Sequence, residues 1–215
     1  MSPLRERLAA ILASGLSNDA LRHAEQVAHI AAVLHEAFTA AGLRCTIVGG
    51  SAIEIHAPGV YKSGDIDVVI DAVRAANLEA GTREVFEALG FARQGRHWVQ
   101  RDLFVEVPSH DLSDPSEVVR VGDAVFRVVT KEVVLADRIV GFKHWKETGY
   151  GEQAIDMLAA FGDELDMKWL EPKLRSEGSW DAFEALRELA QSQERVTAQS
   201  LLALLDRLRA HGGKP

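Results

Sequence analysis

The stretch of sequence that decides the fold is Ile47-Val48-Gly49-Gly50-Ser51-Ala52, followed by Gly64-Asp65-Ile66-Asp67-Val68. Residues 44–48 form a short apolar strand, and the glycines after it let the backbone turn sharply and come close to a ligand. Residues 52–56 are long enough for one or two helical turns. Backbone amides at a helix start favour phosphate, so we predict that Gly49, Gly50 and Ser51 bind a phosphate group.

The two aspartates begin the next predicted strand, residues 65–70. Side chains two residues apart on a strand point to the same face, so Asp65 and Asp67 lie together while Ile66 and Val68 turn away. Two carboxylates this close repel each other unless a cation lies between them. Such oxygen donors suit Mg²⁺ or Mn²⁺, and we predict both aspartates as catalytic metal ligands.

A third acid, Glu106, lies in the otherwise apolar segment 103–107. Burying a lone ionised carboxylate costs several kcal/mol, so Glu106 should be paired, exposed at a sheet edge, or bound to a metal. Strands of one sheet can bring it to the aspartates. We therefore predict Glu106 as the third catalytic and metal-binding acid, with a solvated edge position as the alternative.

The remaining pattern predicts an α+β chain in which a mixed sheet flanked by helices is followed by a helical C-terminal half. We expect three parts: N-terminal helices at 1–42, the sheet-containing core at 43–129 and a helical domain at 130–211. Histidines 23, 29 and 35 recur every six residues in the first part. Six-residue steps do not share a helix face, so we expect surface or boundary positions and no metal site there.

The glycine turn and the Asp65-Ile66-Asp67 triplet resemble the signature of the DNA polymerase β-like nucleotidyltransferase superfamily, in which a third acid on a later strand completes the site. Residues 131–145 and 152–154 look like those of stand-alone prokaryotic members similar to the abortive-infection toxins of toxin–antitoxin systems. The resemblance implies that Gly49, Gly50 and Ser51 bind the nucleotide and that Arg138 and Lys143 lie near it. Lys62, between the turn and the aspartates, is a further candidate for nucleotide binding.

The activity that this resemblance implies is metal-dependent transfer of an NMP from an NTP, such as ATP, to an acceptor hydroxyl. A toxin-like member would modify tRNA or a protein and would have an antitoxin partner. One alternative is modification of a small molecule such as an aminoglycoside. Another is a module that binds a nucleotide or a partner protein without catalysis, although such a module has no need for all three acids.

A basic, aromatic segment lies between the aspartates and the end of the predicted sheet. Its residues are suited to contact an RNA or an anionic acceptor, but we favour an ordinary charged hairpin face. They are Arg93, Arg96, His97, Trp98 and Arg101.

Composition limits the classes of partner. The net charge of −8 argues against general nucleic-acid binding but is compatible with a metal–nucleotide ligand. The single cysteine, Cys45, excludes an internal disulfide and fits a reducing cytosol as a buried thiol. The N-terminus lacks signal-peptide form, and no apolar run approaches the roughly 18 residues of a membrane span. We therefore expect a cytoplasmic protein without membrane association.

Overall fold

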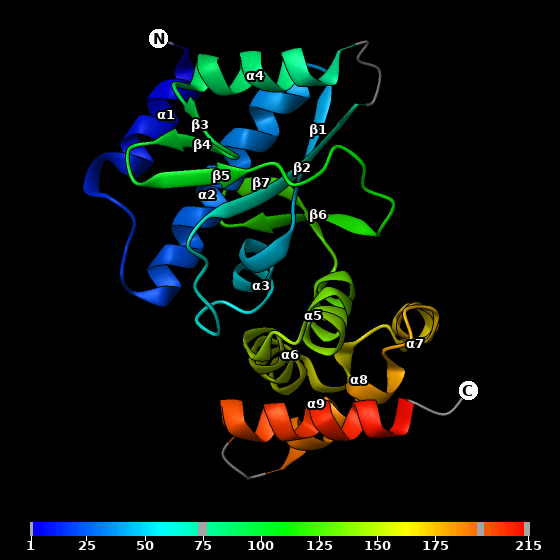
Figure 1. Ribbon diagram of the computed structural model, residues 1–215. Helices are drawn as coiled ribbons and strands as arrows, with labels where there is room; N and C mark the ends of the chain where they lie inside the picture. The colour runs from blue at the N-terminus through cyan, green and yellow to red at the C-terminus, as the bar shows by residue number, and fades with distance from the viewer. Residues whose placement is uncertain (1, 73–76, 193–195, 213–215) are drawn as a thin grey trace. The chain divides into compact units, whose positions relative to one another are not determined.

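The computed structural model describes residues 2–72, 77–192 and 196–212. The chain divides into two compact units, residues 1–130 and 131–215, and each is described by itself. The first unit contains the sheet and the second is helical (Figure 1). The predicted α+β architecture, with helices around a mixed sheet and a helical C-terminal half, is confirmed.

The sheet of the first unit has seven strands among the described residues, in the order β3-β4-β5-β2-β1-β7-β6. The central strand β2 runs antiparallel to β1 and parallel to β5, whereas β1 runs parallel to β7. The outer pairs are antiparallel hairpins. The strands are β1 (Leu43–Ile47), β2 (Ile66–Ala72), β3 (Ala92–Gln94), β4 (His97–Gln100), β5 (Leu103–Glu106), β6 (Ser116–Val121) and β7 (Ala124–Val129).

Period-two alternation divides the residues of β2, β5 and β4 between two faces of the sheet. One row across these strands consists of Ile66, Val105 and Trp98, all of which are buried. Helix α4 (Leu78–Leu89) covers this apolar face, because its Phe86 ring stacks on Trp98 with 4.8 Å between ring centroids. The polar side chains that alternate with these residues project from the opposite face of the sheet.

The N-terminal helices pack directly on the sheet. In the part predicted as N-terminal helices, 1–42, the structure has α1 (Pro3–Ile11), a short 3₁₀ turn (Leu12–Ser14) and α2 (Ala20–Ala40). Helix α2 begins where the Asp19 side chain accepts a hydrogen bond from the backbone N–H of Arg22. Its apolar stripe contacts β1 and β7, so these helices belong to the same compact unit as the sheet.

The expectation for the α2 histidines is wrong at one position. His23 is only 4 % exposed, because its ring pairs with the buried Glu54 of helix α3 (Gly49–His56). His29 and His35 are only partly buried, as the boundary positions that we expected. The six-residue spacing does not predict which of the three histidines meets a partner from another element.

The second unit is a bundle in which α5 contacts α6 and α7, and α6 contacts α8 and α9. Fully buried apolar side chains, among them Phe142, Met157 and Phe183, fill its centre. None of the described helices is long and apolar enough to cross a membrane. The helices are α5 (Lys131–Trp145), α6 (Thr148–Phe161), a 3₁₀ turn (Gly162–Glu164), α7 (Met167–Ser176), α8 (Trp180–Gln191) and α9 (Ala198–Gly212).

Candidate metal and nucleotide site

Three polar residues form a row across adjacent strands on the face opposite the apolar row. In the strand register, Asp67 of β2 pairs with Glu106 of β5, and Glu106 pairs with His97 of β4. Paired residues of neighbouring strands project from the same face, so these side chains leave the sheet together. Asp65 immediately precedes β2 and shares the parity of Asp67. The register therefore brings all three predicted acids to one face.

The distances among Asp65, His97 and Glu106 fit a site for a divalent cation. Donor atoms of Asp65, His97 and Glu106 lie within 4.8 Å of one another. The His97 Nε2 atom is 3.5 Å from Asp65 Oδ2 and 3.5 Å from Glu106 Oε2. The same Glu106 oxygen is 3.2 Å from Arg96 Nε. Carboxylate oxygens with one imidazole nitrogen, partly open to solvent, are a donor set that Mg²⁺ or Mn²⁺ can use.

Asp67 packs against the glycine turn. Gly49 has a φ of +60°, and a Cβ atom placed on it would lie 2.3 Å from Asp67 Oδ2. The backbone N–H of Val48 also donates to the Asp67 carbonyl at 3.0 Å. Glycine is required at position 49 because the Asp67 carboxylate fills the space that a side chain would occupy.

Helix α3 begins at Gly49, so the predicted turn of Gly49, Gly50 and Ser51 is already the first turn of a helix. A Cβ atom at Gly50 would lie 2.8 Å from the Ser63 hydroxyl oxygen, which shows how closely the loop before Asp65 approaches. Ser51 is fully buried, and its hydroxyl donates to the Asp65 carbonyl at 2.9 Å. The Ser51 side chain thus fixes the backbone that carries the first aspartate.

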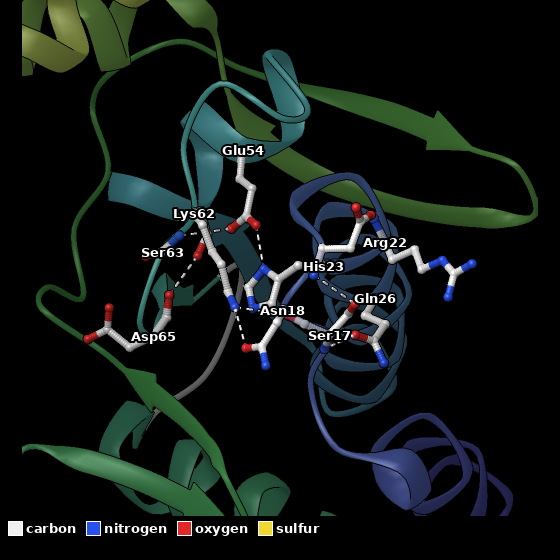
Figure 2. Close-up of polar contacts among 11 residues, drawn as sticks. Ser17, Asn18, Arg22, His23, Gln26, Glu54, Lys62, Ser63 and Asp65 are labelled. Atoms are coloured by element: carbon white, nitrogen blue, oxygen red, sulfur yellow. Dashed lines mark hydrogen bonds and ion pairs between the residues drawn. The ribbon is translucent and has the colours of Figure 1, made fainter.

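A second anchor of this loop is shown in Figure 2. The buried Glu54 carboxylate pairs with the His23 ring and also accepts a hydrogen bond of 3.2 Å from the Ser63 N–H. The predicted nucleotide ligand Lys62 instead donates through Nζ to the carbonyl of Ser17 at 2.9 Å. The loop preceding Asp65 is therefore tied to helix α2 and to the connection before it.

Comparisons with known proteins agree with this geometry at the level of the fold. An antigenic nucleotidyltransferase-like protein from Paracoccidioides brasiliensis matches with a TM-score of 0.54 and 16% identity, covering 80% of this chain and 94% of that one. ANT(2'')-Ia, solved in complex with adenylyl-2''-tobramycin, matches with a TM-score of 0.51 and 16% identity, covering 73% and 98% of the two chains. The chain has the nucleotidyltransferase fold. No family model and no curated protein matches the sequence.

The two cations predicted in the helical half of this nucleotidyltransferase fold are held by contacts within their own unit. Arg138 is 6 % exposed, bonds Asp137 at 2.9 Å and lies over the Tyr150 ring at 4.6 Å. Lys143 donates to the Gly178 carbonyl at 2.6 Å and to an Asp181 oxygen at 2.5 Å. Both side chains link parts of the helical unit.

Sequence reasoning did not assign His97 or Glu54 to the site. His97 appeared only as part of a basic hairpin, although the tight turn between two short strands contained the signal that β4 would pair with β5. Glu54 is a charged residue in an apolar helix, Ala52-Ile53-Glu54-Ile55. A carboxylate in such a setting usually has a dedicated partner, which the structure shows to be His23.

Proposed function

We propose that this chain is a metal-dependent nucleotidyltransferase that moves an NMP from an NTP to an acceptor hydroxyl. The observation that carries the proposal is the set of three acids, Asp65, Asp67 and Glu106, on one face of a sheet with the nucleotidyltransferase fold. A fold by itself does not specify an activity, so the argument depends on these side chains.

Each acid has a distinct position from which to act. Asp65 and Asp67, on successive same-face positions, would hold divalent ions, and Glu106 would complete the site from the neighbouring strand. When bound, the ions supply positive charge to the triphosphate and to the departing pyrophosphate. The acceptor oxygen bonds to the α-phosphorus as the bond to the β-phosphate oxygen breaks, and Glu106 receives the proton of the acceptor hydroxyl.

The first turn of α3 is the proposed cradle for the phosphates. The N–H groups of the first helical residues have no partner within the helix, and the positive end of the helix dipole favours an anion. Because the Ser51 hydroxyl is engaged with the Asp65 carbonyl, Ser51 would contribute its backbone N–H rather than its side chain. Gly49 and Gly50 would contribute in the same way.

Two classes of acceptor are candidates. The sequence resemblance to toxin–antitoxin members favours tRNA or a protein, with an antitoxin as the partner. A small molecule is the second candidate, since one protein with this fold was solved with an adenylylated aminoglycoside. In either case the acceptor hydroxyl must reach the open face beside Glu106, whose side chain is 17 % exposed.

The test is incubation with each α-labelled NTP, Mg²⁺ or Mn²⁺, and one acceptor class at a time: total tRNA, a protein extract, or an aminoglycoside mixture. We expect label on one class, and Asp67→Asn should reduce transfer by more than about a hundredfold. Glu117→Gln, which neutralises an exposed acid on edge strand β6, is the matched control and should transfer normally. Transfer that survives in Asp67→Asn would refute the assignment.

A further inference from the structure

We infer that His97 Nε2 is a direct ligand of a divalent ion held with Asp65 and Glu106, and that this nitrogen shifts the site's preference from Mg²⁺ towards Co²⁺ and Mn²⁺. The inference deepens the proposed function and rests on it for the reaction that the ion serves. It adds a residue from the β3–β4 hairpin to a site otherwise built from carboxylates.

The positions of the donor atoms support a shared ion. Ligand atoms at roughly 2.1 Å from a metal lie about 3.0 Å apart at adjacent octahedral positions and about 3.4 Å apart in a tetrahedron. The Nε2 atom of His97 is 3.5 Å from one oxygen of Asp65 and 3.5 Å from one of Glu106. Nε2 is thus already close to ligand spacing from both oxygens, and the donor atoms of all three residues lie within 4.8 Å of one another.

The surroundings hold the imidazole in this orientation. His97 is the direct register partner of Glu106, so both Cβ atoms project from the same face. The Phe104 ring packs on the imidazole edge to face, with 5.9 Å between centroids and an angle of 84°. The His97 side chain is 24 % exposed, which leaves access for an ion and its water ligands.

The chemistry of nitrogen predicts the change in metal preference. Mg²⁺ favours oxygen donors and gains little from an imidazole, whereas the affinity of nitrogen-containing sites rises from Mn²⁺ towards Co²⁺ and beyond. A site of three carboxylates alone would not show this dependence on one histidine. The ratio of Co²⁺ to Mg²⁺ affinity therefore reports on His97 directly.

A simpler role for His97 predicts an effect of opposite sign. If His97 acted only as a cation beside the carboxylates, as Arg96 does at 3.2 Å from Glu106, then each would compete with a metal ion for the same oxygens. Replacing either residue with glutamine would then strengthen metal binding. If His97 is a ligand, its replacement weakens binding, whereas Arg96→Gln leaves binding unchanged or strengthens it.

The experiment measures Co²⁺ and Mg²⁺ binding to the full chain by calorimetry, together with the visible absorption spectrum of bound Co²⁺. We expect His97→Gln to weaken Co²⁺ binding by about tenfold or more and Mg²⁺ binding by clearly less, with a changed Co²⁺ spectrum. The matched control is His29→Gln, which alters a histidine 3.7 Å from Asp123 and should leave both affinities unchanged.

Unchanged or stronger Co²⁺ binding by a folded His97→Gln protein would overturn the inference. That result is separable from failure of the proposed function. Labelled NMP transfer by the unaltered chain, together with intact Co²⁺ binding by His97→Gln, would leave the nucleotidyltransferase proposal standing without the histidine ligand. Absence of transfer, together with the expected loss of Co²⁺ affinity, would retain the metal site and remove the reaction.

Discussion

Replacing Gly49 with alanine should damage the acidic site through one contact whose size can be worked out from the structure. The new Cβ atom would lie 2.3 Å from Asp67 Oδ2, far inside van der Waals contact, so the carboxylate or the start of α3 must move. The backbone φ of +60° adds a separate penalty of about 1–2 kcal/mol for any residue with a Cβ atom.

Gly122 provides a matched control for the backbone penalty. Its φ is +61°, and a Cβ atom placed there meets nothing within 4 Å. We expect Gly122→Ala to lower the free energy of unfolding by about 1–2 kcal/mol and to leave metal binding unchanged. Gly49→Ala should lose a further 1–3 kcal/mol or so, the usual range for overpacking, because the Asp67 contact is added to the same strain.

The assay is urea unfolding followed by circular dichroism, with Mn²⁺ affinity measured by calorimetry on the same samples. Displacement of Asp67 should weaken Mn²⁺ binding by about tenfold in Gly49→Ala only. If the two variants lose equal stability and bind Mn²⁺ equally well, the packing of Asp67 against Gly49 has no energetic role. The predicted clash between a side chain at position 49 and Asp67 would then be wrong.

Three further outcomes follow from other contacts. Asp156 is exposed on α6, and partial desolvation, followed by the charge of Glu152, raises the pKa of its carboxyl. Asp156→Asn should therefore raise the melting temperature at pH 7 slightly, because solvent screens the charge, and should not raise it below the ordinary pKa of 3.8. Burial, and then the charge of Asp71, raise the pKa of the Cys45 thiol, so a thiol reagent at pH 8 should label the unfolded chain and leave the folded protein unlabelled. Lys143→Met removes two hydrogen bonds, one to α8 and one to the turn before it. Urea unfolding should show a free energy of unfolding that is lower by about 1.5–3 kcal/mol.

The acidic pair and its strand were predictable because the signals are local. Asp65 and Asp67 share a face through period-two geometry, and the strand that carries them is apolar enough to be recognised alone. Glu106 required one more inference, that β5 pairs with β2. Its apolar neighbours and the cost of burying a lone carboxylate favoured that pairing.

The contacts of His97 and Lys62 were not predictable because they join segments distant in sequence. His97 reaches Asp65 only through the order β4-β5-β2, in which strand pairing and register act together. The contact of Lys62 with the Ser17 carbonyl depends on the path of the chain between α1 and α2. A basic residue near a phosphate motif has the same sequence signature whether its partner is a ligand or a backbone carbonyl.

The pair of His23 and Glu54 connects helix α2 to the loop that carries Asp65, an acid of the candidate site. A protein shortened to start at β1 would leave Glu54 as a buried charge without its imidazole, and the segment before Asp65 would lose the helix against which it is fixed. The His23 and Glu54 side chains therefore help to fix the position of Asp65. Substitutions in α2 can thus shift the position of Asp65 without altering any of the three acids of the candidate site.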